Sequence, residues 1–313
     1  MLVSIIIPNW NGAAHLPTCL DSLRAQTVRD FEVIVADNAS TDGSLDLLAR
    51  DYPEAQVIAL DRNRGFTGAC NAGLRAGRGE ILILLNNDTE ADRHWLAEVA
   101  AAFERHPAAG LVASKMLLFD RRNILHCAGD VFKTDGTPGN RGVWEEDRGQ
   151  YGEGPVFSAN GGSAAYRRAL LEQVGLLDED FFFSCEDVDL AWRAQLAGWQ
   201  CIYAPRAVVY HKLQATSGGG GTASFHDGRN FIYLLTKDVP GSLWRKYGFQ
   251  FLRGQLQITL AALRAWRGAA ARARLRGQAA GLLGIPRMLG KRRALQAQRR
   301  VTDEYLDSLL TPV

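Results

Sequence analysis

The sequence predicts an α/β protein with a mainly parallel sheet that helices cover on both faces. Over the first hundred residues, short aliphatic runs alternate with helical patterns in a β-α-β-α-β-α-β series. Because the runs are short, aliphatic and bounded by polar turns, we expect them to be buried parallel strands. From residue 229 onward the pattern is helical. It becomes strongly basic beyond residue 240, which predicts a C-terminal basic helical extension.

The elements follow in order along the chain. The expected strands of the first hundred residues span 2–7, 31–36, 56–60 and 81–85, and the helices between them span 14–25, 44–50 and 67–76. Ser40 and Asp42 lie where a cap for the second helix is expected. Beyond residue 90 we expect a helix at 93–105, a strand at 110–118, helices at 167–174 and 185–197, and one strand or two short ones at 201–210.

Two segments have less regular patterns. Residues 119–154 are rich in Gly, Asp and Arg, and we expect them to form an excursion over one edge of the sheet. Gly218–Gly221 are four consecutive glycines, whose conformational freedom predicts a mobile loop.

Charge divides the chain into two parts. Residues 1–238 carry 22 basic and 31 acidic residues, a net charge of −9, whereas residues 239–313 carry 14 basic and 3 acidic residues, a net charge of +11. A basic tail on an acidic body favours a polyanionic partner. The five cysteines are widely spaced and odd in number, which argues against a disulfide framework or a zinc site.

Polar segments follow all four expected strands, at residues 8–11, 37–42, 61–66 and 86–88. Ligands of parallel sheets bind at these strand ends. Asp88 follows a fully apolar strand and suits Mg²⁺ or Mn²⁺, which often take only one or two ligands from the protein; a simple turn is the alternative. Asp37 is placed to accept a base N–H or a ribose hydroxyl, although a cap and turn also explain part of its segment.

Three carboxylates, Glu186, Asp187 and Asp189, begin the helix that follows the aromatic run 181–183. Clustered acids beside apolar rings raise one another's pKa, which makes a carboxylate a useful general base. The alternative is the common acidic preference of helix N-termini. Arg193 lies four residues after Asp189 and can pair with it. His211 follows an apolar strand and is a candidate for the rim of a site, although a lone histidine is more often structural.

Taken together and in order, the segments VSIIIPNWN, FEVIVADNASTDGS, NRGFTGACNAGL, ILILLNNDTE, FFFSCEDVDLAWRAQLAGW and VVYHK resemble the family 2 glycosyltransferases, in particular a bacterial rhamnosyltransferase-like branch. The resemblance covers about residues 1–240. It implies the GT-A fold, a Rossmann-like α/β half joined to an acceptor-binding half. We therefore expect a glycosyltransferase domain at 1–240 and a basic amphipathic helical extension at 241–313.

The resemblance also implies roles for individual residues. Asp187 matches the general base, with Glu186, Asp189 and Arg193 in support. Asp88 matches the main ligand of Mg²⁺ or Mn²⁺, because Asn86 stands where many members have the first Asp of a D-x-D motif, and His211 can complete the metal or diphosphate site. The nucleotide-sugar binding residues implied in this way are Pro8, Asn9, Trp10, Asp37, Asn63, Gly65, Phe66, Asn71 and Asn87.

The predicted function is the transfer of a sugar, with inversion, from a nucleotide-diphosphate donor to a hydroxyl of a glycan or lipid-linked acceptor in cell-surface polysaccharide assembly. The resemblance alone suggests rhamnose from dTDP-rhamnose. A non-catalytic sugar-nucleotide-binding scaffold and a sugar nucleotidyltransferase are the alternatives. The latter usually needs a Lys- or Arg-bearing loop after the first strand, but the first lysine here is Lys115.

The basic segment 241–302 interleaves Arg and Lys with Trp, Leu and Phe, as do helices that settle on anionic lipid. The alternative is a helical extension packed on the catalytic domain. No nucleic-acid reader motif is present, so we expect no nucleic-acid partner. The sequence shows neither a signal peptide nor an apolar run long enough to span a bilayer. We therefore expect a cytoplasmic protein, peripheral on the inner face of the membrane.

Overall fold

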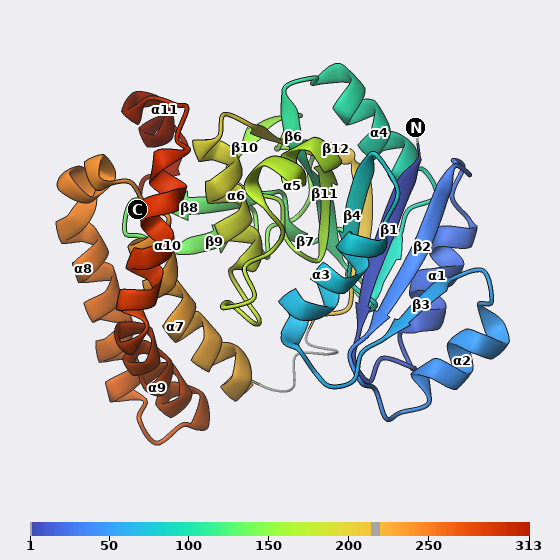
Figure 1. Ribbon diagram of the computed structural model, residues 1–313, viewed down its shortest axis with the longest axis horizontal. Helices are drawn as coiled ribbons and strands as arrows, with labels where there is room; N and C mark the ends of the chain where they lie inside the picture. The colour runs from blue at the N-terminus through green and yellow to red at the C-terminus, as the bar shows by residue number, and fades with distance from the viewer. Residues whose placement is uncertain (1, 214–219) are drawn as a thin grey trace.

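The computed structural model describes residues 2–213 and 220–313, and its centre is one large mixed sheet (Figure 1). Four parallel strands form one half, in the order β4-β1-β2-β3. They are β1 (Val3–Asn9), β2 (Phe31–Asp37), β3 (Gln56–Ala59) and β4 (Ile81–Leu85). These strands have the positions and direction that the sequence predicted, with ends shifted by no more than two residues.

The other half of the sheet continues from β4 in the order β11-β6-β12-β10. β11 (Ser163–Arg167) is antiparallel to both of its neighbours, β4 and β6 (Ala109–Leu118). β12 (Gln200–His211) is parallel to β6 and is one strand with an irregularity between Ala204 and Val208. Three short strands complete the sheet, namely β5 (Thr89–Ala91) on β12, β7 (Leu125–Cys127) on β6 and β10 (Gly154–Val156) on β12.

Helices cover both faces of the sheet, as predicted. Alternate residues of β1 point to opposite faces, so Ile5 and Ile7 pack in one hydrophobic cluster and Ile6 in another. The first cluster includes residues of α1 (Leu16–Arg24), α2 (Ser44–Asp51) and α4 (Trp95–Arg105). The second includes residues of α3 (Gly65–Ala76), α5 (Arg168–Val174) and α6 (Glu186–Leu196).

Two local predictions need correction. β3 lies at the edge of the sheet with β2 as its neighbour, so Gln56, Val57 and Ala59 are exposed and the strand is not buried. The N-cap of α2 is Gly43, at a φ of 83°. The carboxylate of Asp42 accepts from the Ser44 N–H at 3.1 Å, as a capping group does. Ser40 instead accepts from Asn9 and from the backbone of Asn11.

The C-terminal part is an array of helices at the end of the molecule opposite α2 (Figure 1). Its helices are α7 (Gly220–Lys237), α8 (Gly241–Arg264), α9 (Ala269–Leu283), α10 (Ile285–Ala297) and α11 (Asp303–Ser308). The last strand, β13 (Leu310–Thr311), pairs in parallel with β8 (Asp130–Lys133), which pairs in turn with β9 (Pro138–Asn140). The expected excursion at 119–154 therefore contains β7, β8 and β9 and receives a strand from the far end of the chain.

Hydrophobic packing runs across residue 240. A third cluster joins Phe132 and Trp192 to Leu234, Phe251 and Leu306. The division into 1–240 and 241–313 stays a prediction about folding units.

The glycine run needs a further correction. Helix α7 begins at Gly220 rather than near residue 229, so Gly220 and Gly221 belong to a helix and not to a loop. Gly218 and Gly219 lie outside the described residues. No helix in the described ranges has the length and apolar composition needed to cross a bilayer.

Candidate functional site

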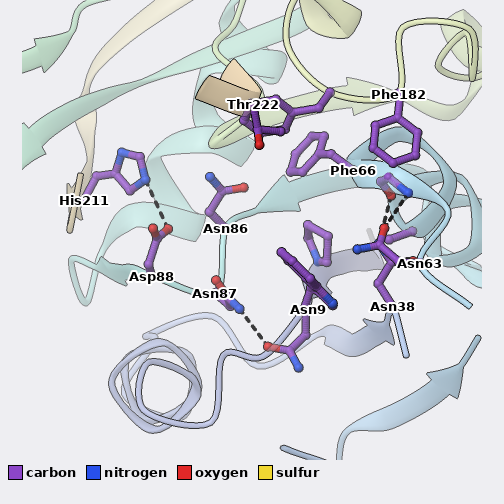
Figure 2. A pocket seen from close by; sticks show the side chains of 15 residues that line it. Asn9, Asn38, Asn63, Phe66, Asn86, Asn87, Asp88, Phe182, His211 and Thr222 are labelled. Atoms are coloured by element: carbon purple, nitrogen blue, oxygen red, sulfur yellow. Dashed lines mark hydrogen bonds and ion pairs between the residues drawn. The ribbon is translucent and has the colours of Figure 1, made fainter. Parts of the chain in front are cut away.

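A cavity of about 390 Å³ opens at the carboxyl ends of the parallel strands (Figure 2). Asparagine is the commonest residue of its wall, which also includes three phenylalanines. We call it the first cavity. Its lining residues are Pro8, Asn9, Trp10, Asn38, Asn63, Gly65, Phe66, Ala69, Asn86, Asn87, Asp88, Phe182, Phe183, His211 and Thr222. Most of the residues predicted to bind a nucleotide sugar therefore lie around one space.

The floor of the first cavity is a chain of hydrogen bonds between three strand ends. Asn87 Nδ2 donates to Asn9 Oδ1 at 2.7 Å, and Asn9 Nδ2 donates to Asp37 Oδ2 at 2.8 Å. The other oxygen of Asp37 accepts from the Ser40 N–H at 2.9 Å. Asp37 is fully buried below the wall and is not among the lining residues. It therefore holds Asn9 in place from beneath.

Asn38 organises the next part of the wall, and sequence reasoning missed it although it directly follows Asp37. Its Nδ2 donates to Asn63 Oδ1 at 2.9 Å and to the Gly65 carbonyl at 3.1 Å. Gly65 has a φ of 73°, and a Cβ there would lie 2.5 Å from the carbonyl oxygen of Phe182. Glycine is thus required at position 65, where the start of α3 packs against the segment that carries Phe182 and Phe183.

Asn71 points away from the first cavity. Its Nδ2 donates to the Leu177 carbonyl at 2.9 Å and to Glu179 at 3.0 Å, and its Oδ1 accepts from the Leu177 N–H at 3.1 Å. It therefore fixes the segment that leads to Phe182 and lies outside the cavity wall.

Asp88 and His211 meet at one side of the first cavity (Figure 2). The distance from His211 Nε2 to Asp88 Oδ1 is 3.1 Å. On the far side of its ring, His211 Nδ1 lies 3.1 Å from Nδ1 of His126. Burial and the neighbouring His211 lower the pKa of His126 to about 3, so this ring is neutral. Sequence reasoning missed His126, whose partner lies 85 residues away.

This pair fits a hard divalent cation only in part. Within residues 2–213 and 220–313, no three His, Cys, Asp or Glu side chains converge as a metal site. One carboxylate and one imidazole are compatible with an ion that takes its remaining ligands from phosphate and water. Asn86 Oδ1 is buried without a hydrogen-bond partner among the described residues, and Asn86 lies beside this pair in Figure 2. A cation held here would therefore need the bound donor to complete its coordination.

A second cavity, also of about 390 Å³, adjoins the first. Both cavities are lined by Phe66, Asn86 and Phe183. The second cavity is further lined by residues of β8, β9, α6 and α7 and by the loop 160–162, including Asp130, Asn160, Gly161, Glu186, Asp187 and Asp227. Two compounds can thus bind next to each other, separated by these three shared side chains.

Asp187 in the second cavity is held by backbone N–H groups on both of its oxygens. Gly161 N donates to Oδ2 at 2.7 Å and Val188 N to Oδ1 at 2.8 Å. Burial raises the pKa of Asp187, and these hydrogen bonds act in the opposite direction. Burial and the nearby Asp187 also raise the pKa of Glu186 well above its usual range and that of Asp130 to about 8. The carboxyl best supplied with donors therefore keeps its charge most readily.

Asp130 and Asn160 were not predicted as site residues. Asp130 Oδ1 accepts from the thiol of Cys127 at 3.0 Å and from Asn160 Nδ2 at 3.5 Å. The only signal in the sequence is the segment Asn160-Gly161-Gly162, which has turn-forming residues but no charge.

Asp189 and Arg193 form the predicted pair, but they are not among the lining residues of either cavity. Arg193 donates to Asp189 Oδ2 at 2.9 Å, and Asp189 is fully buried. The other oxygen of Asp189 contacts Lys237 at the end of α7, which also donates to Asp178 at 2.7 Å. These residues therefore anchor α6 and the segment before it.

Comparison with known proteins gives a consistent result. The sequence model described as "Glycosyl transferase family 2" matches residues 4–175. An N-acetylglucosaminyl-diphospho-decaprenol L-rhamnosyltransferase of Mycobacterium tuberculosis is 26% identical over 282 residues, which are 82% of this chain and 91% of that protein.

Solved structures share the fold at lower identity. A Pyrobaculum calidifontis mannosyltransferase in complex with GDP-Man and Mn²⁺ has a TM-score of 0.57 at 21% identity, over 98% of this chain and 82% of that one. The structure of S. aureus TarS residues 1–349 in complex with UDP has a TM-score of 0.59 at 18% identity. The match covers 97% of this chain and 95% of that one. These similarities confirm the expected GT-A fold.

Proposed function

Because the chain belongs to glycosyl transferase family 2, we propose that it transfers a sugar with inversion from a nucleotide-diphosphate donor to an acceptor hydroxyl during cell-surface polysaccharide assembly. The observation that carries this proposal is the adjacency of the two cavities. The first cavity holds the residues suited to a nucleotide diphosphate, and the second presents Asp187. Their three shared side chains stand where donor and acceptor would meet.

Asp187 acts as the general base in this proposal. It removes the proton from the acceptor hydroxyl while that oxygen bonds to the anomeric carbon and the bond from this carbon to the diphosphate breaks. Attack from the face opposite the leaving group inverts the carbon. The two N–H donors on Asp187 keep its carboxylate oriented and oppose the rise in its pKa that burial causes.

A divalent cation, Mg²⁺ or Mn²⁺, would supply positive charge to neutralise a departing diphosphate. Asp88 and His211 would hold it in this protein. Structural neighbours with Mn²⁺ and a nucleotide or nucleotide sugar support such an ion. Asn9, Asn38 and Asn63 supply amide groups for the nucleotide, and Trp10 and Phe66 supply apolar surface.

We propose rhamnose from dTDP-rhamnose as the donor and a lipid-linked sugar as the acceptor. The support is the mycobacterial rhamnosyltransferase, whose name specifies N-acetylglucosaminyl-diphospho-decaprenol and which aligns with most of this chain.

We also propose that the protein acts at the cytoplasmic face of the membrane and contacts anionic lipid through α8. Five large apolar side chains that are 39% to 79% exposed share one stripe of this helix, at Phe249, Leu252, Leu256, Leu260 and Leu263. Arg253 lies four residues after Phe249 and Arg264 lies four residues after Leu260, so both are on the same side of the helix as the stripe. Such a face suits an anionic bilayer surface.

Some basic residues outside α8 pair with acidic residues within the protein, which favours α8 over α9 and α10 as the proposed contact. Arg274 of α9 donates to Asp227 at 3.0 Å. Lys291 of α10 binds Asp178 and Asp180 at 2.5 and 2.7 Å. The alternative interpretation, a helical extension packed on the catalytic domain, thus describes part of α9 and α10.

The proposal is tested by transfer assays with dTDP-rhamnose, UDP-sugars and GDP-sugars, with Mg²⁺ or Mn²⁺, and an N-acetylglucosaminyl-diphospho-lipid as acceptor. Asp187→Asn should keep donor affinity and Tm but lose turnover by about 10²-fold or more. Asp46→Asn, on the exposed surface of α2, is the control and should retain full turnover. NMR of the product should show inverted anomeric configuration. Retained configuration, or normal turnover of Asp187→Asn, would contradict the mechanism.

A further inference from the structure

His126 lies behind the pair of side chains proposed to hold a cation. It is the middle residue of β7, which pairs with β6, whereas His211 ends β12 on the other side of β6. The two ring centroids are 4.9 Å apart, with the planes inclined by 38°, and the two Nδ1 atoms are 3.1 Å apart. No role for His126 follows from the family resemblance.

The hydrogen-bond pattern requires the two rings to have opposite roles. A neutral imidazole carries one hydrogen, on Nδ1 or on Nε2, and the other nitrogen accepts. Two Nδ1 atoms at 3.1 Å therefore share a single hydrogen, so one ring donates it and the other accepts it. The tautomer of His211 thus depends on that of His126.

Asp88 determines which arrangement is favoured in the protein alone. His211 Nε2 lies 3.1 Å from a carboxylate oxygen of Asp88 and donates its hydrogen to that oxygen. When His211 carries a single hydrogen, its Nδ1 is then bare and accepts the hydrogen of His126 Nδ1. A histidine that binds a metal through Nε2 must instead carry its hydrogen on Nδ1 and donate it outward. Only a neighbour that both donates and accepts satisfies His211 in both states.

We propose that His126 is a positioning residue for His211, holding its ring so that Nε2 is aimed at the cation position beside Asp88. His126 Nδ1 donates to His211 in the metal-free protein and accepts from it in the metal-bound protein. The inference rests on the proposed metal role of Asp88 and His211. Residues behind metal-binding histidines typically change metal affinity by roughly 10- to 100-fold.

The first test measures Mn²⁺ affinity of the full chain by titration with electron paramagnetic resonance, in the presence of a nucleoside diphosphate. His126→Phe keeps a ring but neither donates nor accepts, and should weaken Mn²⁺ binding by roughly 10-fold or more. His126→Asn places an amide near the position of Nδ1, so it should restore most of the affinity. His106→Phe is the control, because His106 pairs with Glu153 outside the site. Tm and near-UV circular dichroism verify that each variant folds.

The second test uses the unsubstituted protein and does not depend on activity. ¹⁵N NMR of the histidine rings, with His211→Asn for assignment, should show hydrogen on Nε2 of His211 without metal and on Nδ1 with Mg²⁺ and nucleoside diphosphate. The same tautomer in both samples overturns the inference. Mn²⁺ binding that His126→Phe leaves within twofold of normal also overturns it while preserving the metal site. A wild-type chain that binds no Mn²⁺ rejects the metal site itself and the inference with it.

Discussion

The contact between Asn9 and Asn87 depends on the absence of a side chain at Gly12. A Cβ at Gly12 would lie 2.1 Å from Asn87 Nδ2 and 2.3 Å from Asn9 Oδ1. Gly12→Ala should therefore push the two amides apart and weaken donor binding by about tenfold, the scale of one lost hydrogen bond. Isothermal titration with the donor measures this. Gly152→Ala is the matched control, since a Cβ there has no neighbour within 4 Å. Equal affinity of both variants would show that the asparagine pair is not needed for the nucleotide.

Asp130 makes stability depend on pH. Its folded pKa of about 8 lies above the ordinary 3.8, because of burial and of Asp187. The folded state thus binds the proton more tightly, so its contribution is fully present below pH 4 and is lost as the pH rises towards 8. Between these limits one such carboxyl lowers the free energy of unfolding by about 1.4 kcal/mol per pH unit.

Asp130→Asn should therefore reduce the loss of stability between pH 5.5 and pH 8, because it removes the titrating group and keeps its shape. Urea unfolding at the two pH values measures the effect. Asp46→Asn, an exposed carboxyl on α2, should leave the pH dependence as it is. If Asp130→Asn has the same pH dependence as the wild type, the carboxyl of Asp130 is ionised in the folded protein.

Individual site residues differ in how far the sequence predicts them. Asp88 and His211 follow buried strands, and such ends meet at one edge of a sheet, so their proximity could be expected. The family resemblance also led us to expect Asn71 at the donor, but helix rotation relative to the sheet decides its direction, and it faces Leu177. His126 carries no local signal at all, since only the pairing of β7 with β6 brings it to His211.

At the scale of elements, β7 shows where sequence patterns fail. It has three residues, too few to display an alternation of apolar and polar side chains. Yet this alternation sends His126 to His211 and the next residue, Cys127, to Asp130. One short strand thus supports both cavities. The longer strands β1 and β4 could be predicted because their sequences are runs of mainly aliphatic residues. Both strands are fully buried in the structure.

Helix α8 carries a prediction about membranes. Leu256→Glu combined with Leu260→Glu should reduce binding to vesicles that contain phosphatidylglycerol by roughly tenfold or more, because two apolar contacts are lost and like charge is added. Flotation measures the bound fraction, and 0.5 M salt should weaken wild-type binding. Leu45→Glu on α2 is the control, because α2 lies at the other end of the molecule (Figure 1). Binding that is equal in all three proteins would exclude α8 as the contact.

At the scale of the whole molecule, opposite charges join the acidic body to the basic extension. Lys291 of the extension binds Asp178 and Asp180. Lys237, which ends α7 just before the extension, is buried between Asp178 and Asp189. Burial lowers the pKa of Lys237, but the nearby carboxylates, Asp189 first, raise it more strongly. The sequence showed the charge division, but not that much of it is compensated inside the protein, because that depends on which helix faces reach residues 178–189.

Lys237→Met should therefore destabilise the fold by about 2 kcal/mol, since Asp178 and Asp189 each lose one of two basic partners and keep only Lys291 and Arg193, respectively. Urea unfolding measures the change, and turnover should fall with it because α6 carries Asp187. Lys246→Met, which removes an exposed pair with Asp307, is the control and should change stability little. A similar small effect for Lys237→Met would mean that solvent reaches the carboxylates around it.

The pairing of β13 with β8 has a consequence for the order of folding during synthesis. The four parallel strands β1 to β4 need only residues 3–85, so a nascent chain on the ribosome can assemble that half early. β8, which begins with Asp130, gains its parallel partner only after residue 311 has been translated. The support behind β8, which lines the second cavity, is therefore completed after the parallel half of the sheet that carries the first strand ends of the first cavity.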